Sequence, residues 1–137
     1  MIRSAFAELY ARHLGCPLPV SSAATTYRNP GIHPRTAAAL AARGVAPDVL
    51  LSFRPRHLDD VAARLEPGTV ALGMTAEHLD ALRSYPLLAA GGFLLEQTHS
   101  GSNEIADPLF EGGWERAFER IAVCVEALVE ELGRRGG

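Results

Sequence analysis

Apolar residues recur at helical spacing near both ends of the chain. A helix is predicted over about 3–14, and Gly15 ends it. A second helix is predicted from about 114 to 132. The face of the first consists of Phe6, Leu9, Tyr10, His13 and Leu14, and that of the second of Trp114, Phe118, Ile121, Val125, Leu128 and Leu132. We expect each helix to bury this face.

The middle of the chain alternates between strand and helix patterns. The predicted strands are LPVSSAATTY (18–27), TVALGM (69–74) and PLLAAGGFLL (86–95), and the predicted helices lie over about 34–44, 57–68 and 76–84, the last capped by Thr75. This alternation is typical of an α/β fold, in which helices cover both faces of a short parallel sheet. We expect one domain over residues 1–137.

Composition excludes several classes of protein. All 13 basic residues are arginine, the formal net charge is -3, and no basic stripe indicates a nucleic-acid partner. The longest apolar run is too short to span a membrane, and we expect no signal peptide, because the first fifteen residues carry charge and lack a continuous apolar run. Two cysteines do not form a disulfide framework. We expect a bacterial, cytoplasmic protein with reduced cysteines.

Five histidines are scattered along the chain, at positions 13, 33, 57, 78 and 99. None forms a pair with the spacing of metal ligands, so we expect no metal site. The glycine pairs match no nucleotide-binding fingerprint either. No cofactor is expected.

Four stretches resemble the low-molecular-weight protein tyrosine phosphatases. IRSAFAELYARHLG is similar to the end of that family's phosphate-binding loop, C-x5-R-S, and the helix after it. SSAATTYRNPG is similar to the S-A-[GA]-T strand end and the variable loop. TVALGMTAEHLDALRS resembles the strand and helix D-x-I-L-x-M-D-x-x-N-L, and EIADPLFEGGWERAFERIAVCVEALVEEL resembles the D-P-Y loop and closing helix. All four keep the family's order and spacing.

This resemblance implies a three-layer fold and a two-step hydrolysis of phosphate monoesters through a phosphocysteine, without a cofactor. It implies that Arg3 grips the phosphate oxygens in bidentate fashion and that Ser4 donates a hydrogen bond to the thiolate. Asp107 is the implied general acid and, later, general base. The implied partner is a phosphorylated protein or a small aryl phosphate. Taken without the other stretches, Ser4 is simply expected as a helix N-cap, and Asp107 as a turn residue.

The sequence departs from the family at the nucleophile. In C-x5-R the cysteine lies six residues before Arg3, which is upstream of Met1 and outside this chain. Neither Cys16 nor Cys124 is followed by an arginine six residues later in the sequence. The spacing of the two cysteines also does not fit the redox relay of the related arsenate reductases. We therefore expect this chain as it stands to be inactive. A non-catalytic phosphate- or phosphopeptide-binding relative, and an arsenate reductase-like protein, are the alternatives.

A second departure concerns the phenyl slot. Leu109 stands where the family has a tyrosine after the D-P pair, and Tyr27 and Phe110 are the candidate aromatic neighbours. The loss of one ring contact costs about 0.5–1.5 kcal/mol. This places a preference for phosphotyrosine in question.

The family's first strand is also absent from this chain. Its place lies inside the sheet, so its absence leaves the two neighbouring strands about 9–10 Å apart with unpaired backbone groups. Three explanations are open: the sequence starts too late; the short chain closes the sheet or borrows a strand in a homodimer; or it is a degenerate binding relative. The first of these predicts that the chain alone folds poorly or dimerises.

Overall fold

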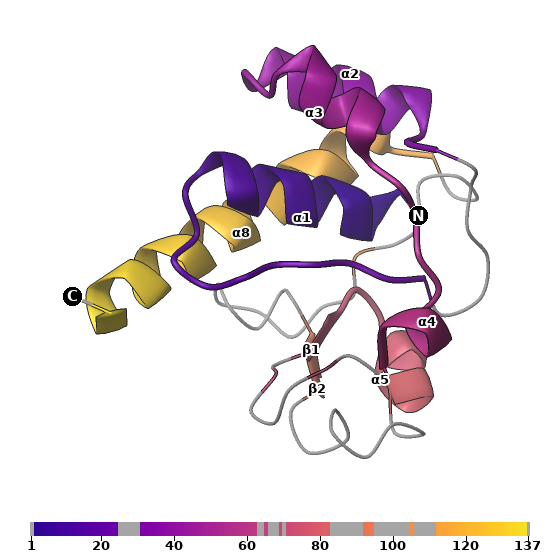
Figure 1. Cartoon of the computed structure of the whole chain (residues 1–137), viewed down its shortest axis with the longest axis vertical. Helices are drawn as coiled ribbons and strands as arrows, with labels where there is room; N and C mark the ends of the chain where they lie inside the picture. Colours follow the sequence, from indigo (N-terminus) through magenta and orange to yellow (C-terminus); the bar gives the residue numbers. More distant parts are fainter. Residues whose placement is uncertain are drawn as a thin grey trace.

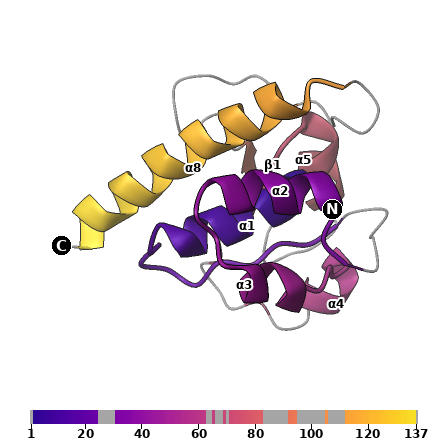
Figure 2. The same ribbon diagram turned by 90° about the horizontal axis from the view of Figure 1, so that it is seen from above.

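Two helices from opposite ends of the sequence lie side by side (Figures 1 and 2). They are α1 (Arg3–His13) and α8 (Trp114–Gly136). The computed structural model describes residues 2–24, 31–62, 65, 69, 71–82, 92–94, 105 and 112–136. Both predicted terminal helices are confirmed.

Helix α1 forms where the apolar spacing predicts it and ends at a glycine. Phe6 is completely buried and Tyr10 is 5% exposed, whereas Leu14, just beyond the last turn, is 38% exposed. Gly15 has φ +79°, a conformation that other residues rarely adopt, and this reverses the chain after the helix. The apolar face therefore extends through Tyr10 and Ala11, and the prediction was wrong for His13 and Leu14, which are both exposed at the end of the helix.

Helix α8 supplies the other half of the main core. Its residues Phe118, Ile121 and Val125 are buried, and the Phe118 ring stacks on Phe6 of α1 with 4.8 Å between ring centroids. Toward the end of the helix, Leu128 and Leu132 are only half-buried. The apolar face predicted for this helix is thus confirmed, and its side chains become less buried toward the C-terminal end.

Two shorter helices follow in the sequence, and the first of them packs on α1 (Figure 2). Helix α2 (Pro34–Ala42) begins with a proline and ends before Gly44, whose φ is +94°. Helix α3 (Pro47–Ser52) was not predicted, because six residues give too little periodicity. Its only signals are the proline at its first position and Asp48 in its first turn.

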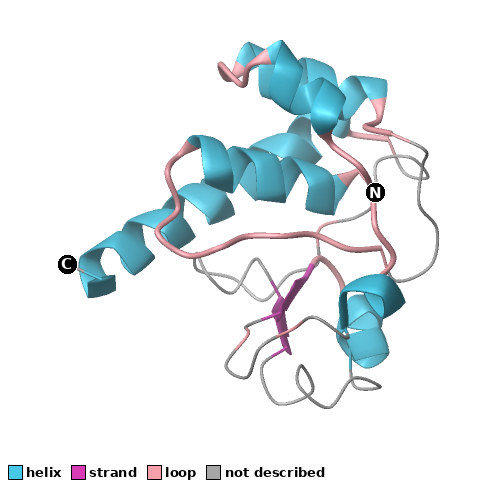
Figure 3. Cartoon of the chain, in the orientation of Figure 1, coloured by secondary structure: helices cyan, strands magenta, loops and turns pink. Residues whose placement is uncertain are grey.

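The sheet in the described ranges has two parallel strands, shown in magenta in Figure 3. Strand β1 (Ala71–Gly73) pairs with β2 (Gly92–Leu94). The neighbouring side chains of β1 point to opposite faces: Leu72 packs on the core that α1 and α8 share, and Ala71 packs on a second cluster with Leu58 and Leu82.

Helices therefore cover both faces of β1, as the α/β prediction requires. The second cluster is built on α4 (Leu58–Ala62) and α5 (Ala76–Leu82). The predicted strand 18–27 forms no regular strand where it is described: Leu18 lies in a bend, and the described part makes one parallel bridge, Ala24 with His57. Among the described residues, no backbone pairs with β1 on the edge away from β2.

Candidate active site around Arg3

Arg3 is the first residue of α1, and its side chain reaches a segment 102 residues further along the chain. Arg3 Nη1 donates a hydrogen bond to the carbonyl oxygen of Ile105 at 2.6 Å. The preceding residue, Ile2, is buried in the main core and its carbonyl accepts from Phe6 N. The backbone at Arg3 is thus fixed by packing, while its side chain is half-buried.

Ile105 is in turn fixed to the end of β1. It is 1% exposed, and its N–H donates to the carbonyl oxygen of Met74 at 2.8 Å. Met74 is the residue immediately after β1 and is itself buried. One nitrogen of the Arg3 guanidinium is therefore held by a carbonyl whose own position depends on the sheet.

His78 of α5 completes this group. Its Nδ1 accepts a hydrogen bond from the backbone N–H of Met74 at 3.0 Å, and its Nε2 lies 3.5 Å from Arg3 Nη2. Thr75 Oγ1 accepts from His78 N at 3.4 Å, as its predicted capping role requires. We call Arg3, Met74, His78 and Ile105 the Arg3 cluster.

Gly73 makes room for this imidazole. A Cβ at Gly73 would lie 2.9 Å from His78 Cβ and 3.3 Å from Leu79 Cδ2. Real side chains do not approach this closely, so the site requires glycine for its space and not for its backbone angles. The close approach of β1 to the first turn of α5 is what brings His78 to Arg3.

The other predicted site residues fall into two groups. Ser4 is the second residue of α1 and is half-buried, and Ile2 occupies the N-cap position, so Ser4 is not the cap. The structure does not test its proposed bond to a thiolate. Four further predicted residues lie outside the described residues, namely Tyr27, Asp107, Leu109 and Phe110.

Neither cysteine is in a disulfide bond, and the two lie 13 and 121 positions after Arg3 in the sequence. Cys16 follows the far end of α1, a helix whose 11 residues rise about 16 Å. Cys124 is 1% exposed and packed in the core on α8. Neither thiol is placed to attack a phosphate held at Arg3.

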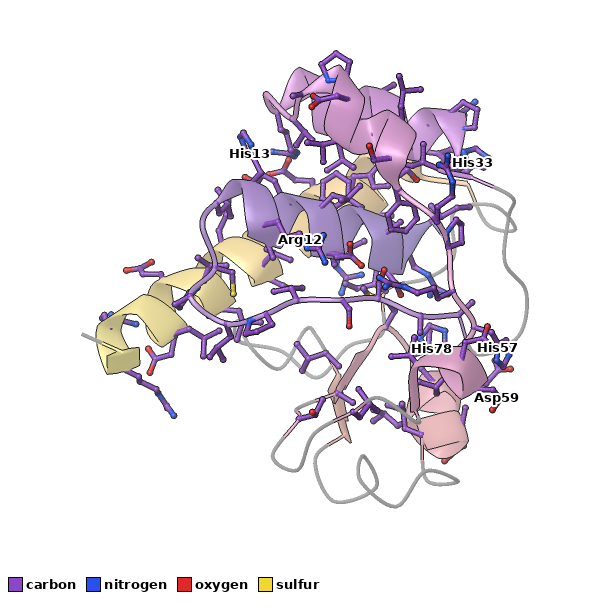
Figure 4. The ribbon with its side chains drawn as sticks, in the orientation of Figure 1. Arg12, His13, His33, His57, Asp59 and His78 are labelled. Atoms are coloured by element: carbon purple, nitrogen blue, oxygen red, sulfur yellow. The ribbon has the colours of Figure 1, made fainter. Side chains whose placement is uncertain are left out.

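The remaining histidines serve local structure where they are described. His33 caps α2 and stacks on Trp114, and His57 Nδ1 accepts from Asp59 N. Figure 4 shows that His13 projects from the far end of α1, away from His78. The described ranges contain no group of three residues able to hold a metal ion. No helix in the same ranges is long and apolar enough to cross a membrane.

Solved structures identify the fold. YfkJ from Bacillus subtilis superposes with a TM-score of 0.81 at 20% identity, over 98% of this chain and 89% of that one. The YwlE arginine phosphatase from Geobacillus stearothermophilus gives 0.78 at 24%, over 97% and 86%. A low-molecular-weight protein tyrosine phosphatase from T. tengcongensis gives 0.76 at 19%, over 94% and 90%. This chain has the low-molecular-weight phosphatase fold.

The resemblance indicated by the four stretches is therefore confirmed at the level of fold. No family model matches this sequence, and no curated protein matches it significantly. In this fold the first stretch and the last meet, because Arg3 of the first contacts Ile105 of the last.

Sequence reasoning missed His78, which it treated as one of five scattered histidines. A signal was present, because the motif D-x-I-L-x-M-D-x-x-N-L places His78 at its asparagine position. The distance between His78 and Arg3 could not be obtained from this pattern, since the two residues are 75 positions apart.

Proposed function

We propose that this chain binds phosphate monoesters at Arg3, as a protein of the low-molecular-weight phosphatase fold. The observation that carries the proposal is the hydrogen bond from Arg3 Nη1 to the Ile105 carbonyl. Anchoring one nitrogen reduces the entropy lost when the rest of the guanidinium binds an oxyanion. The planar fork of donors then matches two oxygens of a phosphate group.

The location of Ile105 supports a role for Asp107 at the same site. Asp107 follows Ile105 by two residues in the sequence, and Ile105 is the residue that Arg3 contacts. We propose Asp107 as the general acid and base of a phosphatase site, and Ser4 as a polar residue beside the phosphate. Tyr27, Leu109 and Phe110 are proposed to line the slot for the group that carries the phosphate.

The cysteines determine what this chain does with a bound phosphate. Cys16 follows the far end of α1 from Arg3, and Cys124 is 1% exposed in the core, so neither thiol is offered to a phosphate at Arg3. We therefore propose binding without turnover for the chain as given. The same positions weigh against an arsenate reductase-like function, which needs reactive thiols near the oxyanion.

The proposed ligand is a phosphorylated side chain of a cytoplasmic protein. One structural neighbour is named an arginine phosphatase and another a protein tyrosine phosphatase. The sequence has Leu109 where the family has a tyrosine, so we assume no preference for phosphotyrosine. Peptides with phosphotyrosine or phosphoarginine are therefore the two ligands to compare.

The test is a titration of the folded chain with phenyl phosphate and with the two peptides, followed by NMR. Loss of a charge-assisted fork costs about 1.5–3 kcal/mol or more, so Arg3→Ala should weaken binding by at least about tenfold. Arg3→Lys, which keeps the charge but not the fork, should give an intermediate affinity. Arg116, an exposed residue of α8, provides the matched control, and Arg116→Ala should bind as the parent does.

Two results would contradict the proposal. One is equal affinity in the Arg3→Ala and Arg116→Ala variants, which would leave only a non-specific charge effect. The other is turnover of p-nitrophenyl phosphate that disappears in Cys16→Ser or Cys124→Ser, which would make one of these thiols a nucleophile.

A further inference from the structure

The proton on His78 has a defined position. Neutral imidazole has one lone pair on a ring nitrogen and one N–H. Met74 N–H donates to Nδ1 at 3.0 Å, so Nδ1 carries the lone pair and the proton lies on Nε2. His78 is thus an N–H donor on the side that faces Arg3.

The contact between His78 and Arg3 is consequently a contact between two donors. Nε2 and Arg3 Nη2 are separated by 3.5 Å, which is at the limit for a hydrogen bond, and each nitrogen carries hydrogen. The opposite tautomer would let Nε2 accept from Arg3, but it would place two N–H groups 3.0 Å apart at Met74. The shorter contact decides the tautomer. His78 therefore does not hold Arg3 by accepting from it.

Two N–H donors side by side suit one oxyanion. Arg3 Nη2 and His78 Nε2 are 3.5 Å apart. At this separation one phosphate oxygen can accept a hydrogen bond from both nitrogens. The arrangement is rigid, since Ile105 anchors the arginine and Met74 anchors the imidazole. Gly73 keeps the imidazole close, as a Cβ there would collide with His78 Cβ at 2.9 Å.

We infer that His78 is a second anion-binding residue, whose Nε2–H binds the same phosphate group as Arg3. The inference rests on the proposed function, because it requires phosphate at Arg3. It goes beyond that function by adding a neutral donor that the resemblance does not assign. Such a donor adds a hydrogen bond to the oxyanion without the cost of burying a second positive charge.

Two substitutions separate the roles of the two ring nitrogens. In His78→Asn, the amide oxygen can take the place of Nδ1 and accept from Met74, but no atom takes the place of Nε2. In His78→Gln, the longer side chain can present an amide N–H near the place of Nε2. The first variant removes the proposed donor and keeps the backbone contact, while the second restores the donor.

The experiment is a titration of the isotope-labelled full chain with inorganic phosphate and, separately, with phenyl phosphate, at constant ionic strength. The imidazole nitrogen signals of His78 report its tautomer in the free chain, and the Nε2–H signal should shift on saturation. We expect His78→Asn to weaken binding by about tenfold and His78→Gln to bind within about threefold of the parent. A response to phenyl phosphate beyond that to inorganic phosphate identifies a monoester site.

The outcomes distinguish the two proposals. If Arg3→Ala weakens phosphate binding and His78→Asn does not, the role of His78 is overturned and the proposed function stands. If the parent chain binds neither phosphate nor phenyl phosphate, the proposed function fails, and the inference fails with it. If both His78 variants unfold, an unshifted Nε2–H signal in the saturated parent chain overturns the inference.

Discussion

Tyr10 of α1 donates a hydrogen bond to Glu126 of α8, with 2.5 Å between Tyr10 Oη and Glu126 Oε2. The tyrosine ring is buried in the core beside Phe6, whereas Glu126 is exposed. The guanidinium of Arg43 lies over the same ring, 5.4 Å from its centroid. A polar contact thus ties the two central helices together at the edge of their apolar contact.

Removal of the Tyr10 hydroxyl should weaken this helix pair. We expect Tyr10→Phe to lower the free energy of unfolding by about 1 kcal/mol, because the ring remains and Glu126 can be solvated in the variant. Urea denaturation measures this change. Glu126→Gln, which can still accept the hydrogen bond, should cost less, and equal losses in the two variants would contradict this account.

The same contact predicts loss of stability at alkaline pH. Burial raises the pKa of Tyr10 above its usual value of about 10, and the hydrogen bond to Glu126 and its negative charge raise it further, against the lowering effect of Arg43. The unfolded chain therefore releases this proton at lower pH than the folded chain. The stabilisation is complete below pH 10 and is lost as the pH rises through the pKa of the folded state.

Denaturation at several pH values from 8 to about 11 should show this slope. Tyr10→Phe lacks the titrating hydroxyl, so its unfolding free energy should fall less steeply with pH than that of the parent. Parallel pH curves for the two proteins would show that Tyr10 has the same pKa in both states.

Glu8 tests whether burial or a short distance determines how much an ion pair contributes to stability. Its carboxylate is 2% exposed and accepts from Ser22 Oγ at 2.8 Å, with Arg12 and Arg56 at 3.5 and 3.6 Å. Glu119 makes a shorter ion pair, 2.8 Å from Arg43, but is 67% exposed. We expect Glu8→Gln to cost about 1–3 kcal/mol and Glu119→Gln less than about 1 kcal/mol, since solvent weakens the exposed pair. Denaturation in urea compares the two variants, and a larger loss in Glu119→Gln would contradict the prediction.

Gly73 should tolerate no side chain. Gly73→Ala places a Cβ against His78 and Leu79, and we expect a loss of about 1–3 kcal/mol in stability together with weaker phosphate binding. Gly133 of α8 is the matched control, because a Cβ there meets nothing within 4 Å. Gly133→Ala should be neutral or stabilising, as expected for alanine in an exposed helix. Equal thermal stability of the two variants would contradict the role of Gly73.

The parts of this fold that the sequence predicted are those determined by local patterns. The stripe from Trp114 to Leu132 and the glycines after α1 and α2 act within a few residues, and all are confirmed. The strand 18–27 is found as a single bridge in its described part because strand pairing depends on distant partners such as His57. Local periodicity carries no information on which partner is present.

The candidate site was predictable only in part for the same reason. The resemblance singled out Arg3, and the structure describes it at the start of α1, in contact with Ile105. The position of His78 beside it depends on the space at Gly73 and on the turn between β1 and α5, which combine only in three dimensions. A contact between residues so far apart in the sequence produces no hydrophobic periodicity and no motif spacing from which it could be predicted.

The long sequence separation of the central contacts has a consequence for synthesis on the ribosome. The Arg3–Ile105 contact joins residues 102 positions apart, and the Tyr10–Glu126 contact spans 116. Helix α1 precedes α8 by about a hundred residues in the sequence, so its partner surface on α8 is translated well after it. The apolar face with Phe6 therefore lacks its α8 partner until that helix is made, and a nascent chain that exposes an apolar face is prone to aggregate or to need a chaperone.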